Sequence, residues 1–169
     1  MLRTILFLLF GFCSGALAKQ TVYQTPSDFL RAAFRGKLPP TQSISLSGAQ
    51  QGRIARLLGH RYRTSRVRYW ASGNRMVVIL EEIGKTLPIT TGYVVDSGKI
   101  SQVKVLIYRE SHGYEVSRTA FTRQFKGAQL RSDGRLTKRI NNIAGATLSV
   151  RALSGLGRVA LYLDQIRPR

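Results

Sequence analysis

YVVDSGKISQVKVLI, residues 93–107, is the stretch that decides the fold. Residues 93–95 are strand formers, and residues 96–99 (DSGK) favour a tight turn. Apolar side chains then recur on the far side of the turn at Ile100, Val103, Val105 and Ile107. The stretch therefore predicts an antiparallel β-hairpin.

A second hairpin is predicted immediately before this one. Val67 and Tyr69 alternate with basic residues, and Ser72-Gly73-Asn74 is a turn sequence. Residues 76–80 (MVVIL) then form an apolar run of the length of a buried strand. Together the two hairpins predict a sheet of four antiparallel strands.

Helical segments are predicted on both sides of the hairpins. Ser27 is placed to cap a short helix, and a second helix is expected from about Ser47 to Leu58 with Gly59 as its stop. Residues 117–125 have weaker helical character. The fold class is therefore α+β: a small antiparallel sheet of two hairpins packed with helices, and a long C-terminal helix following the Gly-Ala-Thr turn at 145–147.

The N-terminus predicts export. Arg3 precedes an apolar run at residues 5–12, and Ala16-Leu17-Ala18 places small residues where a signal peptidase cleaves. The run is shorter than the roughly 20 apolar residues that span a bilayer, which disfavours an uncleaved membrane anchor. We expect a signal peptide, residues 1–18, cleaved after Ala18, and a periplasmic or cell-envelope protein whose residues 19–169 form one domain.

The only cysteine, Cys13, lies within this predicted signal. The mature chain would then have no disulfide, thiolate metal site or cysteine nucleophile. The histidines are His60 and His112 alone, and the carboxylates show no ligand spacing, so no metal site is expected.

The chain is strongly basic, with 27 Lys and Arg against 8 Asp and Glu and a formal net charge of +19. Such a surface attracts anionic membranes, acidic proteins and phosphorylated cofactors. An alternative is a solvated basic surface that only keeps the protein soluble. Residues 61–70 interleave arginines with aromatics as single-stranded nucleic-acid platforms do. For an exported protein we interpret them instead as an edge strand with one solvated basic face, and expect no nucleic acid partner.

Two motifs resemble catalytic or nucleotide-binding signatures without the required context. Glu110, Ser111 and His112 are the residue types of a hydrolytic triad, but sequence neighbours in or beside a strand point to alternating faces and cannot line up. Residues 155–160 (GLGRVA) match a dinucleotide fingerprint, yet they lie inside a helical pattern with no strand before them. We interpret those glycines as close-packing positions in the terminal helix.

The most informative stretch is INNIAGATLS, residues 140–149, where the chain turns into its last helix. Gly145 permits a backbone conformation that a side chain would block, while Thr147 and Ser149 place hydroxyls beside the unpaired amides of a helix N-terminus. Such a turn can seat a phosphate. Taken alone, it is equally well explained as an ordinary glycine turn with a hydroxyl cap.

These residues resemble the FMN-binding domain family, found in flavinylated subunits of the Rnf and sodium-pumping NADH:quinone oxidoreductase complexes and in small exported proteins. The family motif is Asp-x-x-Ser/Thr-Gly-Ala-Thr-x-Ser/Thr. Gly145, Ala146, Thr147 and Ser149 match it. Three further landmarks follow the order of the family, at residues 98–100, 110–113 and 124–127, so that the resemblance covers most of the mature chain.

The resemblance implies FMN as the cofactor, esterified through its phosphate to Thr147 by a dedicated flavin transferase. The amides after Gly145 would hold the phosphate, and residues 110–113 would border the flavin ring. The implied FMN-binding residues are Glu110, Ser111, His112, Gly113, Gly145, Ala146, Thr147, Leu148 and Ser149.

Two positions depart from the family motif. Asn141 stands where the family usually has aspartate, and Ala144 stands where it usually has serine or threonine. Asparagine keeps the shape of aspartate but loses its charge. Non-covalent FMN therefore remains an alternative to the ester.

The resemblance implies an electron carrier rather than a stand-alone enzyme, since the sequence offers no nicotinamide site and no obvious catalytic acid or base. Its partners would be a membrane or periplasmic redox protein, the flavin transferase and an anionic membrane surface. The alternative is a cationic cell-envelope binding protein that keeps the fold without flavin.

Overall fold

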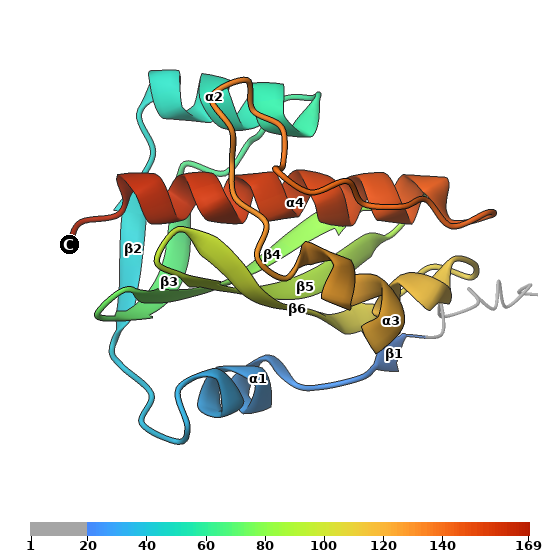
Figure 1. Ribbon diagram of the computed structural model, residues 1–169, viewed down its shortest axis with the longest axis horizontal. Coiled ribbons are helices and arrows are strands. Elements are labelled where there is room, and N and C mark those ends of the chain that lie inside the picture. The colour runs from blue at the N-terminus through green and yellow to red at the C-terminus, as the bar shows by residue number, and fades with distance from the viewer. Residues whose placement is uncertain (1–19) are drawn as a thin grey trace, which may run out of the picture.

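The computed structural model describes residues 20–169, and its architecture confirms the α+β class. Within these residues, six strands form one antiparallel sheet in the order β1-β6-β5-β4-β3-β2 (Figure 1). The strands are β1 (Thr21–Val22), β2 (Thr41–Ser45), β3 (Arg66–Ser72), β4 (Arg75–Ile83), β5 (Pro88–Asp96) and β6 (Lys99–Tyr108). The helices are α1 (Pro26–Ala33), α2 (Gly48–Leu58), α3 (Thr119–Thr122) and α4 (Thr147–Ile166), with short 3-10 turns η1 (Tyr114–Ser117) and η2 (Arg123–Phe125).

Both predicted hairpins are confirmed. In the β5–β6 hairpin Asp96 pairs with Lys99, and Ser97 and Gly98 adopt positive φ angles of 49° and 75°. The β3–β4 hairpin closes over the predicted turn, with Ser72 paired to Arg75. Arg75 also donates to both carboxylate oxygens of Asp96, at 2.8 and 3.1 Å, which ties the two hairpin turns together.

The expected number of four strands is wrong, because β1 and β2 extend the sheet at its two edges. β2 pairs with β3 from Thr41↔Trp70 to Ser45↔Arg66, and β1 pairs with the end of β6. The edge-strand interpretation of residues 61–70 is therefore also wrong, since β3 has a neighbour on each side. Its basic face is exposed as expected, with Arg66 and Arg68 in solvent.

The first two helices begin at side-chain caps. Thr25, not Ser27, caps α1: its hydroxyl accepts a hydrogen bond from the Asp28 amide, because Pro26 already occupies the first turn. At α2, Ser47 and Gln50 form a reciprocal capping box, and Gly59 ends the helix in the left-handed conformation, as predicted.

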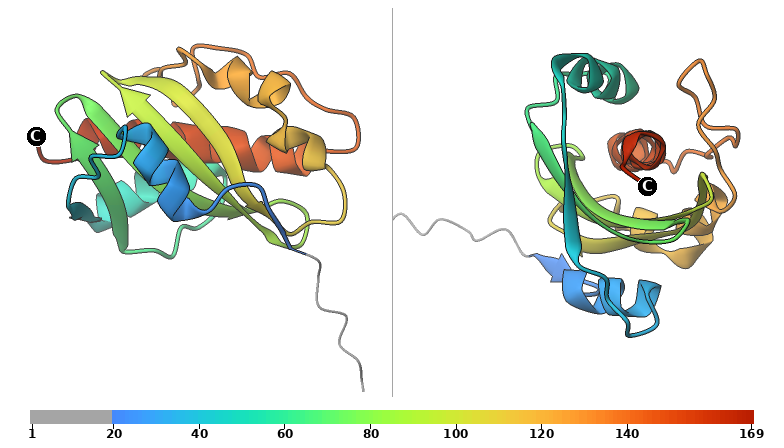
Figure 2. Two further views of the ribbon diagram at one scale, coloured as in Figure 1. Left: turned by 90° about the horizontal axis from the view of Figure 1, so that it is seen from below. Right: turned by 90° about the vertical axis from the view of Figure 1, so that its left-hand side faces the viewer.

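Helices cover the two faces of the sheet unequally. Figure 2 shows α4 in the hollow of the curved sheet with α2 beside it, and α1 on the opposite face. The main core lies between the sheet and α4, whereas a smaller cluster packs α1 on the outer face through Phe29 and Leu30. Phe29 requires Gly92 beneath it, because a Cβ there would lie 2.3 Å from the phenyl ring.

Of the two glycines in residues 155–160, Gly155 is a close-packing position, as predicted. Both lie inside α4 and are buried. A Cβ on Gly155 would lie 3.2 Å from Leu58 of α2, and one on Gly157 would lie 3.5 Å from Ile100 and Phe125. Gly155 thus lets α4 approach α2 closely, whereas the distances at Gly157 are ordinary van der Waals contacts that leave room for a Cβ.

A buried ion pair fixes the end of α4. Arg167 Nε donates to Asp164 Oδ1 at 2.8 Å, and Arg167 Nη2 donates to the carbonyl of Gly73 at 3.0 Å. The side chains of Arg167 and Asp164 are only 4% and 2% exposed. The pair therefore holds the C-terminal end of α4 against the β3–β4 turn.

The predicted signal, residues 1–18, lies outside the described residues. From residue 20 onward, no helix is both long enough and apolar enough to cross a membrane.

Candidate functional site

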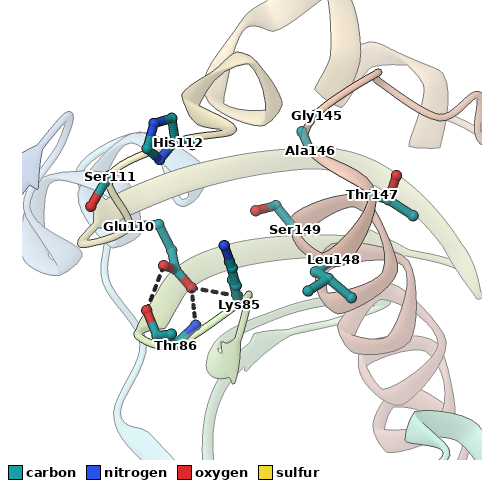
Figure 3. Close-up of a pocket in the computed structure, with 10 residues that line it drawn as sticks. All are labelled: Lys85, Thr86, Glu110, Ser111, His112, Gly145, Ala146, Thr147, Leu148 and Ser149. Atoms are coloured by element: carbon teal, nitrogen blue, oxygen red, sulfur yellow. Dashed lines mark hydrogen bonds between the residues drawn. The ribbon is translucent and has the colours of Figure 1, made fainter.

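A cavity of about 670 Å³ lies at the N-terminal end of α4. Three segments far apart in the sequence form its wall: the β4–β5 turn, the loop after β6 and the first turn of α4 (Figure 3). The volume is within the range of about 300–1,000 Å³ typical of ligand sites. The lining residues are Lys85, Thr86, Glu110, Ser111, His112, Gly145, Ala146, Thr147, Leu148 and Ser149.

The N-terminus of α4 is open toward this cavity. Gly145 has a φ of +80°, and Ala146 occupies the N-cap position. No side chain among the described residues caps this helix, in contrast to α1 and α2. The amides of the first turn, at residues 147–149, therefore remain available to an anion, and the helix dipole favours negative charge there.

Thr147 is the first residue of α4 and is exposed at the cavity wall. Its hydroxyl oxygen accepts a hydrogen bond of 2.9 Å from the side-chain amide of Asn142. The preceding loop is held in turn by Gln124, whose side-chain oxygen accepts from the Asn141 amide at 2.8 Å. The hydroxyl is thus oriented by a chain of contacts within the 124–147 segment.

Glu110 shapes the opposite wall by binding the β4–β5 turn. Its carboxylate accepts hydrogen bonds from the backbone amides of Lys85, Thr86 (2.6 Å) and Leu87 (2.9 Å), and from the Thr86 hydroxyl at 3.0 Å. Burial by itself would raise the pKa of Glu110, but these donors outweigh it and hold the pKa below its ordinary value. Glu110 is therefore an ionised anchor of the turn.

The floor of the cavity joins β6 to α4. The Tyr108 hydroxyl donates to the carbonyl of His112 and lies 3.2 Å from the Ser149 hydroxyl. Gly113 fits between them with a φ of +84°, and a Cβ there would lie 3.0 Å from the Tyr108 oxygen and 3.1 Å from Ala146. The loop after β6 is thereby fixed against the start of α4.

The structure brings together the residues that the sequence predicted for the site. Eight of the nine line the cavity, and Gly113 packs directly behind it. Figure 3 shows the side chains of Glu110, Ser111 and His112 pointing in different directions. These three residues lie in a loop beyond β6 and not in a strand, and Glu110 is occupied by the turn amides, so they form no triad.

Three residues of the site were missed from the sequence. Lys85 and Thr86 lie in the β4–β5 turn, and Asn142 precedes α4. A signal for the first two exists in Gly84-Lys85-Thr86, which sets a cation and a hydroxyl beside a glycine between two strands. Lys85 supplies a positive charge to the cavity lining. Within residues 20–169, no group of three His, Cys, Asp or Glu side chains could hold a metal ion.

The comparison with protein families shows the family to which this part of the chain belongs. Residues 84–161 match the model of the FMN-binding domain. These residues belong to the FMN-binding domain family. The match contains every residue that lines the cavity, and it confirms the resemblance and FMN as the cofactor. No curated protein sequence matches the chain.

The residues of this FMN-binding domain fit the cofactor. The open N-terminus of α4 offers amides for a phosphate, and the cavity has the volume of a ligand site. Leu148 is 42% exposed at the wall and supplies apolar surface of the kind that ligand pockets use. Lys85, Thr86 and Ser111 add polar groups to the lining.

Replacing Glu110 with glutamine is expected to lower the free energy of unfolding at pH 7 by about 1–3 kcal/mol, since a charged acceptor of several hydrogen bonds is lost. The pKa of Glu110 in the fold lies below its ordinary value of 4.5. The contribution of ionised Glu110 to the free energy of unfolding is therefore fully present above the pKa that Glu110 has in the unfolded chain. It is lost as the pH falls through the pKa that Glu110 has in the fold.

Urea unfolding of wild type and Glu110→Gln over a pH series measures this effect. The difference in free energy of unfolding between wild type and Glu110→Gln should be constant near neutral pH and shrink as the pH falls below about 4.5. Glu115→Gln, which changes a carboxylate with no side-chain hydrogen bond in the described structure, serves as the control. A difference for Glu110→Gln that persists unchanged at about pH 3 would contradict the assigned role.

Proposed function

We propose that this protein is an exported electron carrier whose FMN is esterified through its phosphate to Oγ1 of Thr147. The observation that carries the proposal is the position of Thr147: its hydroxyl is the first side chain of an uncapped helix and lies on the cavity wall. A phosphate joined to that oxygen would lie beside the unpaired amides of residues 147–149.

The attachment step requires an activated FMN donor and an enzyme. Thr147 Oγ1 attacks the phosphorus of an anhydride of FMN, so that the new O–P bond forms as the anhydride bond breaks. The leaving phosphate group departs, and the hydroxyl proton passes to a base of the flavin transferase. Nothing is oxidised or reduced in this step.

The hydrogen bond from Asn142 supports Thr147 as the acceptor. Because the Thr147 oxygen accepts from the Asn142 amide, its own proton is free to be removed by the transferase. The two departures from the family motif, Asn141 and Ala144, lie at exposed positions, and the hydrogen-bond partner of the Thr147 hydroxyl is Asn142. The hydrogen bond that orients this hydroxyl therefore comes from Asn142 and not from position 141.

The lining of the cavity supports an electron-carrying role. When bound, FMN supplies reversible electron transfer, and the protein contributes position and electrostatic field. Lys85 places a positive charge at the cavity, which favours a negatively charged reduced cofactor. A covalent bond would prevent loss of the cofactor by diffusion outside the cytoplasm. A membrane redox protein is the proposed donor, and a second carrier is the proposed acceptor.

The first experiment tests attachment and export together. The chain is co-expressed with a flavin transferase in an exporting host, and the periplasmic fraction is separated on a denaturing gel under ultraviolet light. We expect a fluorescent band whose mass corresponds to a chain beginning at Lys19 with one FMN. A protein that is yellow when native but loses its colour on denaturation would contradict the ester and support non-covalent FMN.

The second candidate function is a cationic envelope-binding protein without flavin. The net charge of +19 and the two departures from the family motif favour it. This candidate predicts a colourless protein in both the native and the denatured sample. Any bound FMN excludes it.

A second experiment separates the electron carrier from a flavin reductase. The loaded protein is mixed anaerobically with NADH, NADPH or dithionite, and flavin absorbance is followed. We expect dithionite to bleach the flavin at once and both nicotinamides to leave it oxidised over minutes. Rapid bleaching by either nicotinamide would show a reductase activity and contradict the carrier role.

A further inference from the structure

A second cavity, of about 300 Å³, lies on the side of α4 that faces α2, remote from the helix N-terminus. Its wall is formed by α2, the loop at residues 133–135 and the middle of α4. In Figure 1 the connection between η2 and α4 climbs across α4 toward α2, which brings these three segments together. Four arginines line this cavity, namely Arg53, Arg56, Arg135 and Arg158.

These four arginines face a single lining carboxylate. That carboxylate belongs to Asp133, and both of its oxygens already have partners. One oxygen lies 3.2 Å from the guanidinium of Arg131, and the other accepts a hydrogen bond from the backbone amide of Arg135. The positive charge around the cavity is therefore not neutralised by the lining residues that the structure describes. Like charges held together repel each other, and an anion that enters between them relieves the repulsion.

Two of the arginines are fixed by backbone carbonyls. Arg158 donates from Nε and Nη2 to the carbonyl of Leu57 at the end of α2, at 3.0 and 2.6 Å, and burial lowers its pKa from the ordinary value. Arg53 donates from Nη2 to the carbonyl of Ser132 at 3.2 Å. Each of these guanidinium groups keeps further N–H donors for a ligand, and their side chains lose little additional freedom on binding.

We propose that this arginine cavity binds a phosphate group. Guanidinium donors match the oxygens of phosphate, and several of them suit a group with more than one negative charge. The lining contains no aromatic ring on which a base or flavin could stack. The ligand is therefore a phosphate whose remaining part lies outside the cavity, either free pyrophosphate or inorganic phosphate, or the headgroup of an anionic phospholipid.

The test uses the full FMN-loaded protein, so that the cavity at the N-terminus of α4 cannot take the added phosphate. Pyrophosphate is titrated calorimetrically into wild type, Arg53→Gln/Arg56→Gln, and Arg66→Gln/Arg68→Gln. The last variant removes the same charge from the exposed face of β3. We expect saturable binding to wild type, weakened at least about tenfold in the first variant and less than about twofold in the second.

Vesicles distinguish the two sources of phosphate. The proteins are floated with phosphatidylglycerol vesicles, with and without pyrophosphate. If pyrophosphate competes with vesicle binding, and only Arg53→Gln/Arg56→Gln binds the vesicles more weakly, the ligand of the cavity is a lipid headgroup. Saturable pyrophosphate binding with equal flotation of both variants assigns it to a soluble phosphate. Absence of saturable pyrophosphate binding, or an equal loss in both variants, would overturn the proposal. Binding by all three proteins is compared at a temperature at which circular dichroism shows each of them to be folded.

Discussion

Alanine at position 147 is expected to abolish covalently bound flavin. After co-expression with a flavin transferase, Thr147→Ala should give no fluorescent band on a denaturing gel, whereas wild type should give a strong one. The reason is chemical, since the substitution removes the only atom of this side chain that can form an ester. It leaves the open N-terminus of α4 intact, because Thr147 does not cap the helix.

Two comparisons make this expectation specific. Thr147→Ser keeps a hydroxyl at the same backbone position and should retain the band, at reduced intensity if the methyl group helps to orient the oxygen. Non-covalent FMN should still bind Thr147→Ala, measured as flavin released from the native protein by heating. A full-strength fluorescent band in Thr147→Ala would place the attachment at another residue, with Ser149 as the nearest hydroxyl on α4.

The second large effect is expected at the far end of the same helix. Asp164→Ala should lower the free energy of unfolding by about 3–5 kcal/mol, because it leaves the buried Arg167 without its counter-charge. For a protein of this size the change corresponds to a fall of roughly 10 °C in the unfolding temperature. Thermal and urea unfolding followed by circular dichroism measure both quantities.

An exposed pair of the same spacing provides the control. Arg31 lies 3.6 Å from Asp28 on α1, with both side chains more than half exposed, so Arg31→Ala should change the free energy of unfolding by less than about 1 kcal/mol. If Asp164→Ala were no more destabilising than this control, the buried pair would not stabilise the C-terminal end of α4 as described. FMN attachment should remain intact in Asp164→Ala below its unfolding temperature, since residues 147 and 164 lie at opposite ends of the helix.

Sequence reasoning found the elements whose signals are local. The turn at residues 96–99 and the flanking alternation predicted β5 and β6, and Ser47 with Gly59 predicted the ends of α2. The Gly-Ala-Thr turn predicted the start of α4 at Thr147, and the structure begins the helix at that residue. Each of these signals depends on residues only a few positions apart.

Elements that depend on distant partners were not found. β2 (TQSIS) buries only Ile44, and β1 is two residues long, so both are strands because β3 and β6 offer free edges. Lys85 and Thr86 become part of the site because Glu110, some 25 residues later, binds their amides. No periodicity in the sequence reports such a contact.

The two ends of the described chain have different consequences for handling the protein. At the N-terminal end, Gln20 accepts a hydrogen bond from Arg109, beside the loop that walls the cavity, and β1 follows at once. At the other end, the last residues follow Arg167 at the far end of α4, about 30 Å of helix away from Thr147. An affinity tag or surface tether attached after Arg169 would thus leave the cavity accessible to the proposed redox partners, while one attached before Gln20 would start beside its rim.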